Sequence, residues 1–191
     1  MRKFWMIPVG FVFCLLLAAV PVCAQSDMRA DLLRLADTAV ADFDTIEALI
    51  NEGADINAAD ENGETVLMKA ARTNSDIAVA ELLVGWGADV NAVDKNYETA
   101  LMKAAQYNHN PRMAELLGRL GAAVDMVDDQ GETALMKACK YTANEEVVTV
   151  LLLLGSDPKI TANRKMALDF AKKNNALKGT ETLDILKEMS K

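Results

Sequence analysis

The chain has 191 residues, 51% of them hydrophobic, and a formal net charge of −8 at pH 7. A chain of this length fits a single domain. Its acidic balance disfavours nucleic acids and anionic lipid surfaces as partners, so we expect no nucleic-acid binding.

Residues 1–24 have the pattern of a secretory signal peptide. Arg2 and Lys3 precede an apolar stretch, and Val22-Cys23-Ala24 places small residues where signal peptidases cut. We expect cleavage after Ala24, a periplasmic or secreted mature protein at residues 25–191, and no stable membrane insertion once the leader is removed. A retained membrane anchor and lipid modification of Cys23 are the alternatives.

Charge and cysteine use change when the leader is removed. The leader holds two basic and no acidic residues, so the mature chain carries 18 minus 28, or −10. Residues 161–191 have 7 basic and 4 acidic side chains, which gives +3 there and leaves −13 for residues 25–160. Only Cys139 remains in the mature chain, so no intramolecular disulfide can form, and we expect a buried structural thiol.

One phrase recurs along the chain at an interval of 34 residues. It reads Glu64 to Ala70, then Glu98 to Ala104, then Glu132 to Ala138. A fixed period of this length is typical of stacked supersecondary units. The units are expected at about 28–59, 60–93, 94–127 and 128–161, with a C-terminal cap at 162–191.

Each unit is expected to form a polar turn and two short helices. Asp60, Asp94 and Asp128 open three of these turns, where Asp is a turn former. The first unit should have a helix from about Met28 to Val40 and a second capped by Asp44. In the second unit Thr65 should cap a helix to about Arg72, and the next helix should start near residues 74–76. In the following units Asn110 and Asn144 are expected to cap the second helices. The last helix is expected from Thr180 to Met189, with Leu183, Ile185 and Leu186 on one side.

The units resemble ankyrin repeats, whose Thr-Pro-Leu-His-x-Ala signature reads here as Thr65-Val66-Leu67-Met68-Lys69-Ala70. The resemblance implies an all-α solenoid of stacked helix-turn-helix units with turn and loop tips. Met68, Met102 and Met136 replace the signature His, so the polar bond of that His cannot form. We expect these Met side chains to be fillers near the repeat interface.

The resemblance also implies a concave protein-binding face made of the tips and the exposed side of the first helices. The tip positions are Glu61, Asn62, Glu64, Lys95, Asn96, Tyr97, Glu98, Asp129, Gln130 and Glu132. The helix positions are Lys69, Arg72, Thr73, Lys103, Gln106, Tyr107, Lys137, Lys140 and Tyr141. Tyr97 replaces the tip glycine of the other units, and it is expected to stand with Tyr107 and Tyr141 as a partner anchor. The column of Lys69, Lys103 and Lys137 is either a solvated face, balanced by the neighbouring glutamates, or a contact surface.

The sequence offers little that predicts chemistry. His109 is the single histidine, in a polar loop without a second ligand, and no phosphate-binding loop or nucleophile set is present. We expect no cofactor, no metal and no enzymatic activity. The leading hypothesis is an exported, monomeric protein-binding module, such as an inhibitor, an immunity-type partner or a scaffold for an envelope enzyme. A carboxylate-based hydrolase and a self-associating structural array are the alternatives.

Overall fold

The structure is a computed structural model that describes residues 22–36, 43–73, 77–108 and 110–191. Most of the expected leader, the expected helix start at residues 74–76 and His109 lie outside these ranges. Within them the chain forms helices joined by turns, with three isolated β-bridges, so the all-α prediction is confirmed.

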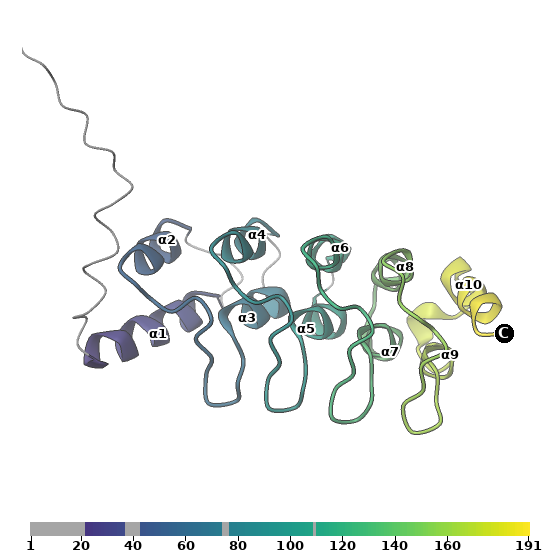
Figure 1. Cartoon of the computed structure of the whole chain (residues 1–191). Helices are drawn as coiled ribbons and strands as arrows, with labels where there is room; N and C mark the ends of the chain where they lie inside the picture. Colours follow the sequence, from purple (N-terminus) through teal and green to yellow (C-terminus); the bar gives the residue numbers. More distant parts are fainter. Residues whose placement is uncertain (1–21, 37–42, 74–76, 109) are drawn as a thin grey trace, which may run out of the picture.

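The helices form two parallel rows along the array (Figure 1). The inner row holds the first helix of each unit: α1 (Val22–Ala36), α3 (Val66–Thr73), α5 (Ala100–Tyr107), α7 (Ala134–Tyr141) and α9 (Ala167–Ala171). The outer row holds α2 (Phe43–Asn51), α4 (Ile77–Gly85), α6 (Pro111–Arg119), α8 (Glu145–Leu153) and α10 (Glu181–Met189). A 3-10 turn, η1 (Asn175–Leu177), separates α9 from α10. The tips extend from the inner row as a line of loops on the side away from the outer row (Figure 1).

Side-chain caps explain where the short helices begin. The hydroxyls of Thr99 and Thr133 accept the third-residue amides of α5 and α7, both at 3.3 Å. Asn110 caps α6 in front of Pro111, and Asn144 caps α8. Because the first amides of a helix have no partner inside it, these caps satisfy donors that would otherwise be lost. The predicted caps Thr65, Asn110 and Asn144 are therefore confirmed.

The core is a column of the same side chains repeated from unit to unit. Leu67, Leu101 and Leu135 are each at most 1% exposed, and so are Met68, Met102 and Met136. The expected role of the methionines as interior fillers is confirmed. Helices of eight or nine residues are marginal alone, so packing of α3, α5 and α7 side by side must supply their stability.

Backbone bonds connect the tips of neighbouring units. The amide of Lys95 donates to the carbonyl of Asn62, and that of Asp129 donates to the carbonyl of Asn96, both at 2.9 Å. Gly63 has φ +82°, as expected for a tip glycine. The tips therefore form one continuous edge along the array.

Three expectations about the first and last units need correction. The first helix spans Val22–Ala36, an earlier start than Met28, and residues 37–40 lie outside the described ranges. Asp44 lies in the first turn of α2 because the helix already includes Phe43, so Asp44 is not the cap. Ile185 is 38% exposed, because the face of α10 that turns toward the core is formed by Thr182, Leu183 and Leu186.

Candidate functional site

The turn tips present exposed polar side chains in a row. Seven of the predicted tip residues are exposed: Glu61, Asn62, Lys95, Asn96, Tyr97, Asp129 and Gln130. Since the tips are joined by backbone bonds, these side chains project from a fixed edge.

Tyr97 has a backbone conformation that few non-glycine residues adopt. Its φ is +61°, in the left-handed region, where the equivalent Gly63 and Gly131 have +82° and +76°. A side chain in this region costs roughly 1–2 kcal/mol, because Cβ approaches a carbonyl oxygen. The Tyr97 side chain is 61% exposed, so core packing does not explain its presence. An outlier of this kind is a reason to consider a functional role.

Tyr107 and Tyr141 occupy equivalent places at the ends of α5 and α7, and they are 49% and 46% exposed. Tyr97 precedes α5, whereas Tyr107 ends it. At 1.5 Å per residue, the length of this helix separates the two positions by about 12 Å. The expectation that all three stand together is therefore corrected: Tyr97 lies at one end of the inner helices and the other two at the opposite end.

The expected exposure of the lysine column is also corrected. Lys69, Lys103 and Lys137 are 9%, 5% and 5% exposed, so they form neither a solvated face nor an open contact surface. The glutamates that precede them in each unit are buried as well: Glu64, Glu98 and Glu132. The reason is the small, buried alanines beside the lysines, such as Ala70 and Ala104, which let adjacent inner helices pack closely.

These six residues and three aspartates follow one another as an ion-pair ladder along the array. It is buried except at Asp60, whose side chain is 23% exposed, and it ends at Glu132, which pairs with Lys140 rather than with a lysine of the column. Within each unit the lysine ammonium contacts the aspartate that opens the tip: Lys69 and Asp60 at 2.8 Å, Lys103 and Asp94 at 2.8 Å, Lys137 and Asp128 at 2.7 Å. Between units, Lys103 reaches back to Glu64 at 3.0 Å and Lys137 reaches back to Glu98 at 2.6 Å. Glu98 also pairs with Lys103. The ladder thus links three successive units through buried charge.

Half-buried cations contact the glutamates at both ends of the ladder. Glu64, at the first rung, also pairs with the half-buried Arg72 at 3.3 Å. Glu132, at the last rung, pairs with the half-buried Lys140 at 2.9 Å. In the described chain, the equivalent Gln106 in the middle unit has a buried side-chain oxygen without a hydrogen-bond partner. The predicted helix positions therefore divide into buried lysines, half-buried ladder ends and exposed tyrosines.

The pKa shifts follow from these contacts. Burial alone would lower the pKa of Lys103, but its bonds to Asp94, Glu98 and Glu64 raise it well above its usual value. Burial alone would raise the pKa of Asp60, but Lys69 and the amides of Asn62 and Glu64 lower it. Both shifts keep the ladder charged, which its buried geometry requires.

Sequence reasoning interpreted Asp60, Asp94 and Asp128 only as turn residues and missed their part in the ladder. The available signal was the spacing, because each unit repeats an acid, a second acid four residues later and a lysine nine residues after the first. One oxygen of each aspartate accepts tip amides while the other meets the lysine, as in Asp60 with Asn62 at 2.8 Å.

Cys139 is fully buried, and burial raises the pKa of its thiol to about 12. The expected structural thiol is confirmed.

Within the described ranges, no three His, Cys, Asp or Glu side chains are grouped to hold a metal ion. A hollow of about 530 Å³ lies in the outer row between α6, α8 and α10. Four carboxylates line it: Glu115, Glu145, Glu146 and Glu181.

Comparison with known families decides the assignment of the fold. The family model described as ankyrin repeats (3 copies) matches residues 36–117 and 74–162, which together exceed half of the chain. The chain belongs to the ankyrin-repeat family. Ankyrin repeats are generally protein–protein interaction modules, and the ankyrin array here has the exposed tips that such a role uses. The search of curated proteins found no match. Across the described part of this ankyrin array, no helix is long and apolar enough to cross a membrane.

Proposed function

We propose that this ankyrin array is a non-enzymatic module that binds a protein partner through its tips and the exposed ends of its inner helices. The observation that carries the proposal is Tyr97, an exposed aromatic in a left-handed conformation where the sister units have glycine. Strained conformations of this kind cluster at binding and active sites, so Tyr97 is a candidate for recognition.

The proposed surface combines rigid aromatic anchors with polar surroundings. Tyr97 lies on the tip edge, while Tyr107 and Tyr141 lie about one helix length away at the other end of the inner row. Tyrosines are frequent among the residues that dominate interface energies, since they bury a large area and lose few rotamers. The exposed tip residues Asn96, Asp129 and Gln130 would form the polar rim.

We further propose that the protein acts after export, in a bacterial periplasm or outside the cell. The support is the leader pattern of residues 1–24, with its basic start, apolar stretch and small residues before the expected cleavage point. In that compartment the array would mask an exported enzyme, as an inhibitor or immunity-type partner, or hold an envelope enzyme as a scaffold.

The test is affinity capture with the mature chain, residues 25–191, from envelope extract. The parent is compared with a Tyr97→Ala, Tyr107→Ala, Tyr141→Ala variant, and the retained proteins are identified by mass spectrometry. We expect one protein that the parent retains and the variant loses. Circular dichroism before capture shows that the variant is folded.

A matched control removes one aromatic from the opposite side of the molecule. Trp86 follows α4 in the outer row and is 39% exposed, so Trp86→Ala should retain the same protein. Retention of one protein by both the parent and the tyrosine variant would contradict the proposed surface. If the parent retains nothing and light scattering shows larger species at higher concentration, the self-associating alternative replaces the proposal. Hydrolysis of a substrate that depends on Glu145 or Glu181 would support the enzyme alternative.

A further inference from the structure

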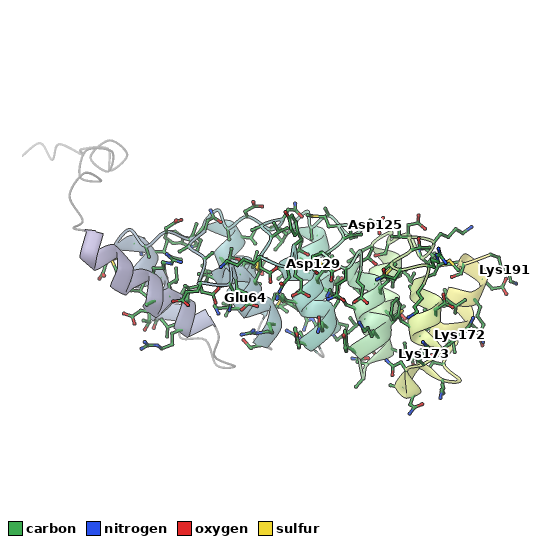
Figure 2. The ribbon with its side chains drawn as sticks, turned by 90° about the horizontal axis from the view of Figure 1, so that it is seen from below. Glu64, Asp125, Asp129, Lys172, Lys173 and Lys191 are labelled. Carbon is green, nitrogen blue, oxygen red and sulfur yellow. The ribbon has the colours of Figure 1, made fainter. Side chains whose placement is uncertain are left out.

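The ankyrin array has opposite charges along its length. Residues 161–191 carry +3, whereas residues 25–160 carry −13. Figure 2 shows Lys172, Lys173 and Lys191 at the C-terminal end and the exposed Asp129 over the middle units, with Asp125 beside it. The end unit is therefore a positive surface next to a negative one, and it attracts anions that the rest of the array repels.

A hollow of about 320 Å³ lies on this end unit, between the last tip and the inner helices. Lys140, Lys165 and Lys173 line it, together with Glu132, Asn163 and Phe170. The hollow continues the proposed binding surface, because Lys140 lies 4.9 Å from the ring centre of Tyr141 and 5.6 Å from that of Phe170.

The repeat register explains why the hollow is cationic. The last tip is one residue shorter than the others, so the position that holds Lys69, Lys103 and Lys137 in the ladder is Phe170 in the last unit. No ammonium therefore reaches back from α9 to Glu132, whose two oxygens bind Lys140 at 2.9 and 3.2 Å. The carboxylate of the hollow is thus already neutralised. No described carboxylate forms an ion pair with Lys165 or Lys173, so the hollow keeps a net positive charge.

The tip beside the hollow has an unusual turn that positions Lys165. Asn163 and Arg164 have φ +51° and +64°, and Ala162 and Lys165 exchange two backbone bonds of 2.9 Å. Turns with two successive positive φ angles strongly favour glycine at the second position, where this chain has Arg164. Asn163 suits the first position, so the strain of this turn falls on Arg164, next to the cationic hollow.

We propose that this hollow receives an acidic side chain from the protein partner, within a segment rich in Asp or Glu. Lys165 and Lys173 contact the carboxylate, and Phe170 packs against the methylene groups of the same side chain. The proposal rests on the proposed function, since the hollow shares Lys140 and Glu132 with the candidate surface. A protein segment is favoured over a small anion because the hollow opens beside Tyr141, where the partner would already lie.

The test measures binding of a fluorescein-labelled ten-residue peptide of alternating Glu and Gly, by fluorescence anisotropy in 50 mM and 150 mM NaCl. The mature parent is compared with a Lys165→Gln, Lys173→Gln variant. A Lys172→Gln, Lys178→Gln variant is the matched control, because it removes the same charge from exposed positions of the same unit that do not line the hollow. We expect at least tenfold weaker binding in the hollow variant and less than threefold weakening in the control.

Several results would overturn the proposal. One is that the Glu–Gly peptide does not bind the parent, or that both variants weaken its binding equally. Another is that a matching Gln–Gly peptide binds the parent equally well. A third is that free glutamate, at the same carboxylate concentration, displaces the labelled peptide. Sedimentation velocity tests for a second copy: self-association of the parent that the hollow variant loses would assign the hollow to that copy instead. If the peptide does not bind but the capture of a partner still depends on the tyrosines, the proposed acidic ligand is wrong and the proposed function stands.

Discussion

Asp60 shows how a single residue serves both the local turn and the array. One of its oxygens accepts the amides of Asn62 at 2.8 Å and Glu64 at 3.0 Å, which shapes the tip. Its other oxygen meets the ammonium of Lys69 at 2.8 Å. The same side chain therefore fixes the turn and anchors the first lysine of the ladder.

The charge on Asp60 predicts how stability depends on acidity. Because its folded pKa is lowered, its contribution is fully present above the unfolded value of about 3.9 and is lost as the pH falls through the folded pKa. We expect the urea midpoint of the parent to fall below pH 4, and that of Asp60→Asn to fall less over the same range. The pKa of Lys103 is raised rather than lowered, so the stability that this residue contributes is present at low pH and persists up to at least pH 10. Equal acid sensitivity of parent and variant would contradict this assignment.

Two tip glycines with similar backbone angles have different surroundings. A Cβ at Gly63 would lie 3.1 Å from the amide nitrogen of Lys95, whereas a Cβ at Gly131 meets nothing closer than Ala162 at 3.8 Å. Gly131→Ala should lower the free energy of unfolding by about 1 kcal/mol through the positive φ alone, and Gly63→Ala by about 2 kcal/mol. Chemical denaturation of both variants measures the two losses. Equal losses of unfolding free energy would mean that the tip next to Gly63 moves aside for the added Cβ at no cost.

At the scale of elements, the ladder joins inner helices that are too short to be stable alone. Glu98 precedes α5 and contacts the lysines of both α5 and α7. Its side chain is 12% exposed, and those of Lys103 and Lys137 are 7% and 6% exposed. Removing one member of a buried ionic group is costly because its partners stay buried with fewer bonds.

Glu98→Gln should therefore destabilise more than Glu132→Gln. We expect a loss of about 2–3 kcal/mol for Glu98→Gln, since two buried ammoniums lose a charged acceptor but keep their aspartates. Glu132→Gln should cost about 1 kcal/mol, because its partner Lys140 has a side chain that is 32% exposed. Urea unfolding of the two variants measures the difference. A larger loss of unfolding free energy for Glu132→Gln than for Glu98→Gln would contradict the central role of Glu98 in the ladder.

The sequence predicted the helices, caps and core closely, but only half of the candidate site. The recurring phrase gave the register of the repeats, and Thr65, Asn110 and Met102 act as expected. The prediction that the lysine column is exposed was wrong because a lysine on a short helix is normally exposed. The periodicity of the sequence alone does not show that the adjacent helices cover it. The strain at Tyr97 could be suspected only because glycine occupies that position in the sister units.

The whole molecule is a one-dimensional array in which each unit contacts its neighbours. Backbone bonds connect the tips, Leu and Met columns fill the interior, and the ladder crosses three units. The end units differ from the middle ones, since Phe170 takes the place of the ladder lysine and the last unit is basic. Stability and surface charge are thus properties of the stack rather than of one unit.

This coupling predicts that damage in the middle spreads to the neighbouring units. Leu101 is 1% exposed between α3 and α7, so Leu101→Asp buries an unpaired charge at the centre of the stack. We expect loss of most of the helical signal and protease cleavage on both sides of residues 94–127. An unchanged thermal melt would show that the units fold independently.

The most direct test of the account is Tyr97→Gly, measured for stability and for partner capture in the same preparation. If Tyr97 is kept for binding, glycine should raise the free energy of unfolding by about 0.5–1 kcal/mol, since relief of the left-handed strain exceeds the entropy that glycine adds. The same variant should lose the protein that the parent captures. A variant that is less stable, or that captures the partner as well as the parent does, would contradict the claim that Tyr97 serves recognition.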